Sequence, residues 1–133
     1  MLENCQIIPL PKITDGRGSL GFVEGRNHIP FNIERVFYLY DVRPGADRGA
    51  HAHKELHQFF IATSGSFDIS LDDGFNKKNF HLTSPEVGLY VGPMIWCELN
   101  NFSAGSVCLA LASQKYDEND YYRKYSDFID ARI

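Results

Sequence analysis

The sequence predicts an all-β domain, folded as a sandwich or a barrel. Short segments rich in β-branched, aromatic and aliphatic residues occupy most of the 133 positions, and turn residues separate them. One segment alternates polar and apolar side chains, and another carries two histidines two positions apart, as strands with distinct faces do. A chain of this length can bury one core, so we treat residues 1–133 as a single domain.

Eight segments have the length and composition of strands. They cover residues 6–8, 19–24, 34–41, 57–63, 66–71, 76–82, 88–91 and 106–112. Residues 66–71 alternate polar and apolar side chains, and Asp72, Asp73 and Gly74 provide a turn into residues 76–82, which predicts a hairpin. Residues 106–112 are more continuously apolar, which suits a central strand, although a buried helix gives the same pattern.

The final stretch, residues 117–133, differs from the rest of the chain. It is acidic at its start and basic later, and Tyr121, Tyr125, Phe128 and Ile129 recur at helical spacing. Acidic residues favour the start of a helix and basic residues its end. We therefore predict a short amphipathic helix that caps the barrel.

Charge and composition exclude several classes of function. The 13 basic and 17 acidic residues give a formal net charge of -4, and no basic stripe indicates nucleic-acid binding. No apolar run reaches membrane-spanning length, and the N-terminus lacks the pattern of a secretory signal. Cys5, Cys97 and Cys108 form no CxxC pair, and their odd number fits a reducing compartment. We expect a soluble cytoplasmic protein that binds neither nucleic acid nor membrane.

The most informative segment runs from Arg48 to Lys54 and contains His51 and His53. Side chains on a strand alternate between its two faces, so these two histidines point to the same face. In a barrel that face can be the interior, where a ligand is held away from water. Imidazole takes up or releases a proton near neutral pH, and it also binds metals. The pair therefore indicates either proton transfer or a metal site.

The residues at the other expected ligand positions favour proton transfer without excluding a metal site. His51, His53 and Gln58 have the spacing of the first metal motif of the cupin superfamily, but Gln58 stands where metal-binding cupins have glutamate. In the second motif, Glu98 stands where these cupins have histidine. Glu98 could complete a triad of two histidines and a carboxylate. We expect no metal, and a metal-dependent cupin enzyme remains the alternative.

The whole chain resembles the sugar-nucleotide 3,4-ketoisomerases of the cupin superfamily, the WxcM-like group that acts on dTDP-4-keto-6-deoxy-D-glucose. The segments that carry the resemblance are residues 15–20 with Glu24, 35–41, 48–54 with Gln58, 93–96 and 121–129. This resemblance implies a cupin jelly-roll barrel, catalysis without a cofactor, and a homodimer with exchanged N-terminal strands. It also implies a product used to make 3-amino-3,6-dideoxyhexoses for surface glycans such as the O-antigen of lipopolysaccharide.

The implied reaction moves a ketone from C4 to C3 of the sugar through an enediolate. Two imidazoles can serve both proton transfers, so we expect His51 to be the base at C3 and His53 its partner. Tyr38 is a candidate hydrogen-bond donor to the ketone oxygen, although core packing in its aromatic strand competes with this role. The candidate substrate-binding residues are Arg17, Arg48, Lys54, Gln58 and Trp96.

These candidates are expected to contact different parts of the nucleotide sugar. Arg48 offers a rigid donor fork to the pyrophosphate or the enediolate, and Arg17 and Lys54 suit other anionic groups. Trp96 suits stacking on the sugar or thymine ring, with a core position as its competing interpretation. Related sequences often have a basic residue after Trp96, where this chain has Cys97. The configuration at C4 of the product therefore stays open, and Arg17 favours dTDP-3-keto-6-deoxy-D-galactose over its gluco epimer.

Three rival functions remain. A deoxysugar 3,5-epimerase also acts on a 4-keto sugar, but it relies on a histidine–aspartate arrangement for which the sequence shows no match. A metal-dependent cupin enzyme would require stoichiometric metal. A barrel that only binds a sugar nucleotide would show affinity without proton exchange.

Overall fold

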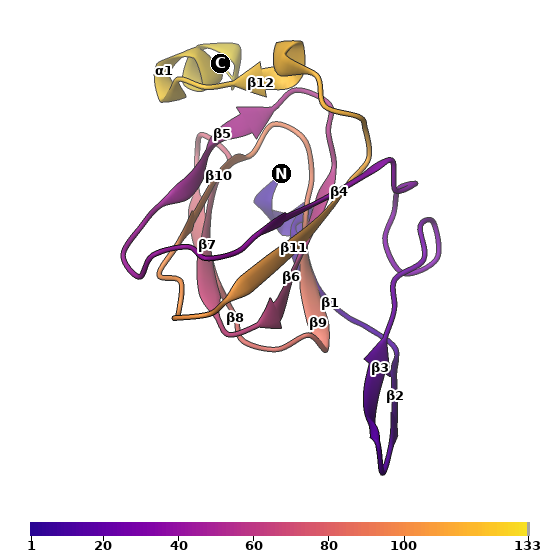
Figure 1. Cartoon of the computed structure of the whole chain (residues 1–133). Helices are drawn as coiled ribbons and strands as arrows, with labels where there is room; N and C mark the ends of the chain where they lie inside the picture. Colours follow the sequence, from indigo (N-terminus) through magenta and orange to yellow (C-terminus); the bar gives the residue numbers. More distant parts are fainter. Residues whose placement is uncertain (133) are drawn as a thin grey trace.

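Two five-stranded antiparallel sheets face each other and form most of the molecule (Figure 1). The structure is a computed structural model that describes residues 1–132. The first sheet contains β1 (Gln6–Pro9), β4 (Arg35–Leu39), β6 (Gln58–Ser64), β9 (Val87–Val91) and β11 (Val107–Ala112). The second contains β5 (Arg48–His53), β7 (Phe67–Asp72), β8 (Lys77–Leu82), β10 (Trp96–Asn100) and β12 (Tyr121–Tyr122). The strand orders are β1-β9-β6-β11-β4 and β12-β5-β10-β7-β8.

Apolar side chains from both sheets form the main core. Phe60 of β6, Ile69 of β7, Leu89 of β9, Leu99 of β10 and Cys108 of β11 are each at most 3% exposed. Removal of apolar surface from water stabilises such a core by roughly 25 cal/mol per Å². The predicted all-β class is confirmed, and the architecture is the predicted cupin jelly-roll barrel with a short C-terminal helix.

Most predicted strands coincide with observed ones. The predicted segments 6–8, 34–41, 57–63, 66–71, 76–82, 88–91 and 106–112 overlap β1, β4, β6, β7, β8, β9 and β11. The predicted hairpin of β7 and β8 is confirmed, and its turn is closed by the N–H of Gly74, which donates to Oδ1 of Asp72 at 2.7 Å. The sequence did not predict β10 or β12.

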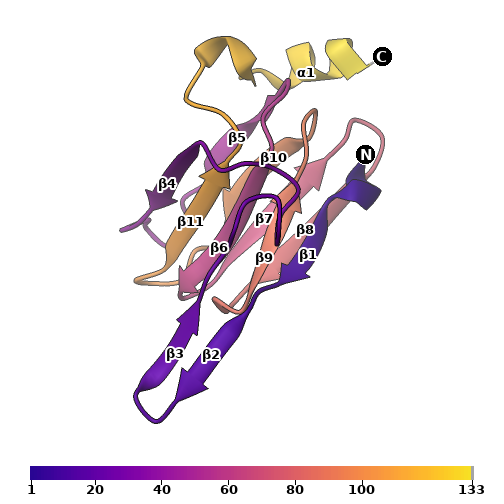
Figure 2. The ribbon, with the colours of Figure 1, turned by 90° about the vertical axis from the view of Figure 1, so that its right-hand side faces the viewer.

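A separate hairpin of β2 (Lys12–Asp15) and β3 (Gly18–Gly21) extends away from the two sheets (Figure 2). The predicted strand over 19–24 therefore ends earlier than expected, and β2 was not predicted. All residues of both strands are exposed, and the apolar side chains of Ile13 and Leu20 are 62% and 56% exposed. This hairpin has no core of its own within the described chain.

The C-terminal segment begins with a one-turn helix, η2 (Glu118–Asp120), continues as β12 and ends in α1 (Tyr125–Arg132). The predicted short C-terminal helix is confirmed as α1, but Tyr121, which the helical spacing included, lies in β12 and pairs with β5 instead. Ile133 lies outside the described residues. Phe128 of α1 is fully buried and packs against Trp96 and Ala52, which fixes the helix on the outer face of the second sheet.

Another one-turn helix, η1 (Leu2–Asn4), precedes β1. No helix within residues 1–132 is long and apolar enough to cross a membrane.

Candidate active site

The two histidines of β5 lie on the same face of the second sheet, as the sequence predicts. The centroids of the His51 and His53 rings are 4.9 Å apart, with an interplanar angle of 89°. His51 lines a pocket of about 400 Å³ whose wall comes from strands of both sheets. His53 lies deeper and is 3% exposed. The pair therefore offers one ring to the pocket, with the second ring directly behind it.

A β-bulge in β5 brings Arg48 and His51 to the same pocket. Cys97 of β10 lies opposite His51, but Leu99 lies opposite Arg48, so β5 contains one extra residue between these pairs. Gly49 occupies this bulge with φ +71, a backbone conformation that strongly favours glycine. Strict alternation would put Arg48 and His51, three residues apart, on opposite faces. The bulge removes that restriction, and both residues line the pocket.

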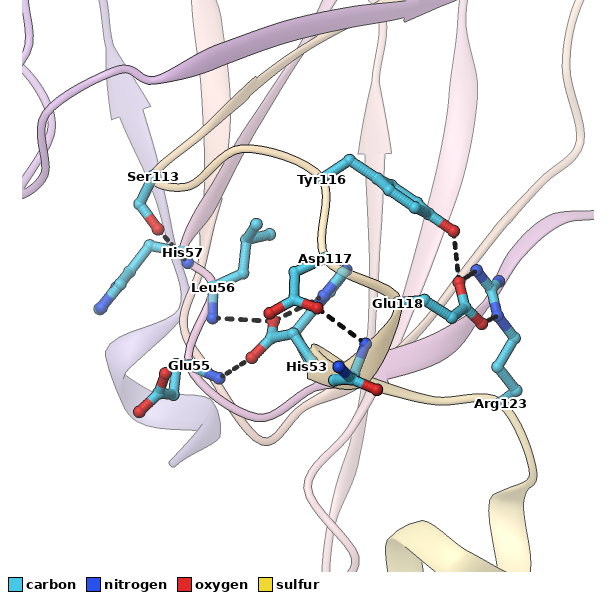
Figure 3. Close-up of polar contacts among 11 residues, drawn as sticks. His53, Glu55, Leu56, His57, Ser113, Tyr116, Asp117, Glu118 and Arg123 are labelled. Atoms are coloured by element: carbon cyan, nitrogen blue, oxygen red, sulfur yellow. Dashed lines mark hydrogen bonds and ion pairs between the residues drawn. The ribbon is translucent and has the colours of Figure 1, made fainter.

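His53 has a buried carboxylate partner. Its Nδ1 lies 3.1 Å from Oδ2 of Asp120, and the Asp120 side chain is 7% exposed. The same carboxylate accepts the backbone N–H of Glu55 at 2.9 Å and that of Leu56 at 3.3 Å. Figure 3 shows these polar contacts around His53, Glu55 and Leu56. The turn that follows β5 thus holds the partner of the second histidine.

A second polar group lies beside the pair. The guanidinium of Arg123 donates two hydrogen bonds to the Glu118 carboxylate, both at 2.7 Å, and the hydroxyl of Tyr116 donates to the same carboxylate (Figure 3). This bidentate pair holds the pKa of Glu118 down at about 2. Arg123 also lines the pocket with His51.

Tyr121 of β12 covers the histidine rings. Its ring centroid lies 4.9 Å from that of His51 and 4.3 Å from that of His53. The Arg123 guanidinium lies over the Tyr121 ring, 4.1 Å from the ring centroid. The C-terminal segment therefore shields the pair from solvent and adds a cation to the pocket wall.

Burial and positive neighbours keep both imidazoles uncharged at neutral pH. Burial, together with the nearby His53 and Arg123, lowers the pKa of His51 from 6.5 to about 4. Burial also lowers the pKa of His53, but the hydrogen bond and charge of Asp120 oppose that shift. Two neutral rings can each accept a proton.

Arg35 adds a cation near the same rings. Its guanidinium lies 5.2 Å from the ring centroid of Phe37 and 5.6 Å from that of Tyr116. Its Nε is buried and has no hydrogen-bond partner among the described residues. Arg35 contributes to the lowered pKa of both histidines. With Arg48 and Arg123 it makes this end of the barrel favourable for an anion.

Comparison with known families identifies the family to which this chain belongs. The FdtA family model, described as WxcM-like, C-terminal, matches residues 3–132. The chain belongs to this family. A curated relative, the TDP-4-oxo-6-deoxy-alpha-D-glucose-3,4-oxoisomerase of Aneurinibacillus thermoaerophilus, is 46% identical over 127 residues, which are 96% of this chain and 91% of the relative. The predicted family and the predicted enzyme class, an isomerase, are confirmed.

Two solved structures of FdtA-like enzymes are similar over nearly their full length. A histidine-to-asparagine mutant of the 3,4-ketoisomerase QdtA from Thermoanaerobacterium thermosaccharolyticum, in complex with TDP-4-keto-6-deoxyglucose, has a TM-score of 0.96 and 43% identity over 99% of this chain and 96% of that one. The WlaRB TDP-quinovose 3,4-ketoisomerase from Campylobacter jejuni has a TM-score of 0.92 and 47% identity over 96% and 98% of the two chains.

The structure of this FdtA-family chain brings together four of the eight residues singled out from the sequence. His51, Arg48 and Gln58 line one pocket, and His53 contacts His51 behind it. Gln58 of β6 is 4% exposed and lines the same pocket as His51.

The other four residues lie elsewhere in the described chain. Tyr38 is 60% exposed on the outer face of β4, because its neighbours Phe37 and Leu39 turn inward and line the pocket. Arg17 lies in the turn of the β2–β3 hairpin, where its side chain is 92% exposed and pairs with Asp15 at 2.6 Å. Neither side chain reaches the histidine pair of its own chain.

Trp96 and Lys54 also lie outside the pocket. Trp96 is a core residue, which was the competing interpretation of its position. It is 8% exposed and packs under α1, with its ring centroid 5.3 Å from that of Tyr125. Cys97, the next residue of β10, points inward instead. Lys54 follows the end of β5, is exposed, and places its Nζ 5.2 Å from the ring centroid of Tyr122.

The residues proposed for a metal do not form a ligand set. Glu98 is exposed on the face of β10 opposite to Cys97, so it lies away from the histidine pair. Gln58 offers only a neutral amide. Within residues 1–132, no group of three His, Cys, Asp or Glu side chains is arranged to hold a metal ion.

Sequence reasoning missed three residues of the site: Asp120, Tyr121 and Arg123. Tyr121 and Arg123 fall in a segment that carries the family resemblance, but helical spacing concealed their contact with β5. Asp120 completes a histidine–aspartate pair although the sequence shows no such arrangement. It is 67 residues away from His53, so no local spacing indicates the pair.

Proposed function

We propose that this FdtA-family protein is a sugar-nucleotide 3,4-ketoisomerase that converts dTDP-4-keto-6-deoxy-D-glucose into the corresponding 3-keto sugar by histidine acid–base catalysis. The observation that carries the proposal is the contact between His51 and His53 at the inner end of a pocket of about 400 Å³. The names of the relatives support the substrate class, since they are described as acting on or binding TDP-linked 6-deoxy sugars.

The proposed reaction moves one proton between neighbouring carbons. Neutral His51 takes the proton at C3, which the adjacent carbonyl acidifies, and the electron pair of that C–H bond forms a C3–C4 double bond. The oxygen at C4 then carries negative charge. The proton then passes from His51 to His53, which delivers it to C4, and the hydroxyl proton of O3 passes to O4 as the carbonyl forms at C3. No atom is gained or lost, so the step needs no oxidant or cofactor.

Cations at the pocket suit an anionic substrate and an anionic intermediate. Arg48 lies at the rim and Arg123 in the wall, so their guanidinium groups can hold the pyrophosphate or stabilise the enediolate. An anion near His51 also raises the affinity of that ring for a proton, which makes it a stronger base in the complex. Gln58, beside His51, can hydrogen-bond a sugar hydroxyl.

The same proposal includes a homodimer that exchanges N-terminal strands. The β2–β3 hairpin extends beyond the sheets and exposes Ile13 and Leu20, which a second copy could cover (Figure 2). In such a dimer, Arg17 contributes to substrate binding only from the neighbouring copy. Sedimentation velocity tests the assembly, and a monomer at micromolar concentration would contradict it.

The configuration of the product at C4 depends on which face receives the proton. We propose the galacto product, dTDP-3-keto-6-deoxy-D-galactose, with its gluco epimer as the alternative. Cys97 lies opposite His51 across the β5–β10 pair and provides no cation there. Proton coupling constants at C4 of the product distinguish the two epimers.

Incubation with dTDP-4-keto-6-deoxyglucose in deuterated water, followed by NMR, tests the reaction. We expect a ketone at C3, with deuterium at C4 to the extent that the proton on His51 or His53 exchanges with solvent before it reaches C4. Deuterium with inversion at C5 would indicate an epimerase, and tight binding with unchanged substrate would indicate a barrel that only binds. Activity that disappears on chelation and returns with a metal would indicate a metal-dependent enzyme.

His51→Asn provides the matched arm of this experiment. Loss of a positioned base lowers turnover by at least about 10²-fold. The affinity for TDP should stay within about twofold, because Arg48 and Arg123 are unchanged. Turnover near that of the unmodified protein would remove His51 from its role.

A further inference from the structure

We propose that Asp120 is a positioning residue for the isomerisation: its carboxylate holds His53 in the tautomer that carries a proton on Nδ1, which leaves Nε2 free to relay protons. This inference rests on the proposed function. Asp120 contacts no substrate-facing surface of the pocket, so it acts through His53.

The contact geometry determines the tautomer. His53 Nδ1 lies 3.1 Å from Asp120 Oδ2, and a carboxylate oxygen can only accept a hydrogen bond. Nδ1 must therefore be the donor, and the lone pair of the neutral ring lies on Nε2. The two side chains are 4% and 7% exposed, so water competes little for the bond.

The position of Asp120 is itself fixed by the backbone around it. Its Oδ1 accepts the N–H of Glu55 at 2.9 Å, its Oδ2 accepts the N–H of Leu56 at 3.3 Å, and its main-chain carbonyl accepts the N–H of Lys54 at 2.8 Å. Three consecutive residues after His53 thus bind one aspartate. The carboxylate cannot turn away from the ring without breaking several of these bonds.

Asp120 makes the two histidines different. His51 contacts the rings of His53 and Tyr121 but has no carboxylate partner among the described residues, whereas His53 has one behind it. A proton taken by His51 from C3 can pass to Nε2 of His53 and then to C4. While His53 carries it, the imidazolium charge lies beside the Asp120 carboxylate and is stabilised there.

The other charges around the pair favour the same assignment. The positive charges of Arg35 and Arg123 lower the pKa of both rings. At His51, the Glu118 carboxylate opposes this lowering but does not cancel it. Asp120 is the group that opposes this effect at His53. The ring backed by a carboxylate is thus the better place for a transient positive charge.

Asp120→Asn tests the assignment with little change in shape. The asparagine amide has one accepting oxygen and one NH₂ group in place of two accepting oxygens, so it cannot accept from His53 Nδ1, Glu55 N–H and Leu56 N–H together, and it carries no negative charge behind His53. We expect kcat to fall about 10²-fold or more. KM should change less than about threefold, because Asp120 does not contact the substrate. Nitrogen-15 NMR should show a smaller share of His53 protonated on Nδ1 than in the unmodified protein, because the carboxylate that favours this tautomer is gone.

Asp117→Asn is the matched control in the same segment. Asp117 is exposed and accepts the N–H of Asn119 at 3.0 Å, a bond that an asparagine oxygen can also accept. Its kcat should equal that of the unmodified protein. An Asp120→Asn variant with unchanged kcat would overturn the inference.

A second measurement does not depend on the stability of any variant. Nitrogen-15 NMR of the unmodified protein should show His53 protonated on Nδ1 at neutral pH, and protonation on Nε2 would overturn the inference. This measurement also separates the inference from the proposed function. A protein that shows the expected tautomer but performs no isomerisation would refute the function, and with it the catalytic part of the inference, and would leave only the control of the His53 tautomer by Asp120.

Discussion

Acidification should destabilise the protein through His51. The pKa of this ring is about 4 in the folded protein, against an ordinary value of 6.5, chiefly because the ring is buried. The unfolded chain therefore binds more protons than the folded chain between these two values, and protonation favours unfolding. The contribution of neutral His51 to stability is complete above the ordinary pKa and is lost as the pH falls toward the folded value.

The two pKa values set the size of the effect. From them, the free energy of unfolding should fall by about 2 kcal/mol at about pH 5, relative to about pH 8, through this ring alone. The loss should reach about 3 kcal/mol near pH 4. For a domain whose total stability is typically about 5–15 kcal/mol, a loss of that size is readily measured.

Urea unfolding at a series of pH values provides the assay, with His51→Asn as the comparison. The variant has no titratable ring at position 51, so its stability should fall less steeply with acid than that of the unmodified protein. The difference between the two curves should approach about 2 kcal/mol at about pH 5. Parallel curves would refute the reasoning, because another group would then account for the acid sensitivity.

Two further predictions concern residues around the histidines. Gly49→Ala should lower the free energy of unfolding by about 1–2 kcal/mol, because φ is +71 there and the new Cβ would meet only ordinary contacts, the nearest at 3.6 Å, so that backbone strain is the cost. Gly16→Ala, where an added Cβ meets no atom within 4 Å, is the control. Equal urea midpoints for these two variants would contradict the expected backbone strain at position 49. Arg48→Ala should raise KM about tenfold without changing the melting temperature. The Arg48 side chain is exposed and lines the pocket, so it can bind an anionic substrate but does not pack in the core. An unchanged KM in steady-state kinetics would show that Arg48 does not bind the substrate.

The sequence predicted the positions of His51 and His53 because their relation depends only on strand geometry. Two residues two apart on a regular strand share a face wherever the strand lies. Tyr38 was different, because β4 has apolar side chains on both faces and alternation alone does not say which face is inside. The structure turns Phe37 and Leu39 inward, so Tyr38 points outward.

Trp96 shows a second limit. Strand β10 follows directly after a turn at Pro93, and the short segment gave no clear period from which to predict it. One of its faces is buried against the opposite sheet, and α1 covers the other face at Trp96 but leaves Glu98 exposed. Whether Trp96 or Cys97 would enter the pocket thus depended on where the C-terminal helix packs.

Asp120 shows a third limit. Its function depends on a contact with His53 across 67 residues, and the helical spacing of the aromatic residues that follow suggested a different local structure. Pairing of β12 with β5 and the hydrogen bonds to the turn after His53 overrode that spacing. Local patterns could not report a structure that tertiary contacts decide.

The buried position of Cys97 allows its alkylation to measure local opening of the barrel. This thiol is 3% exposed, faces inward opposite His51, and its pKa is raised by burial, so an alkylating reagent meets almost no thiolate while the strands stay together. Modification requires β10 to separate from its neighbours for a moment. The rate at which iodoacetamide labels Cys97 can be followed by mass spectrometry, with and without nucleotide. It therefore measures how often the strands around the pocket open locally, with no dye or tag attached.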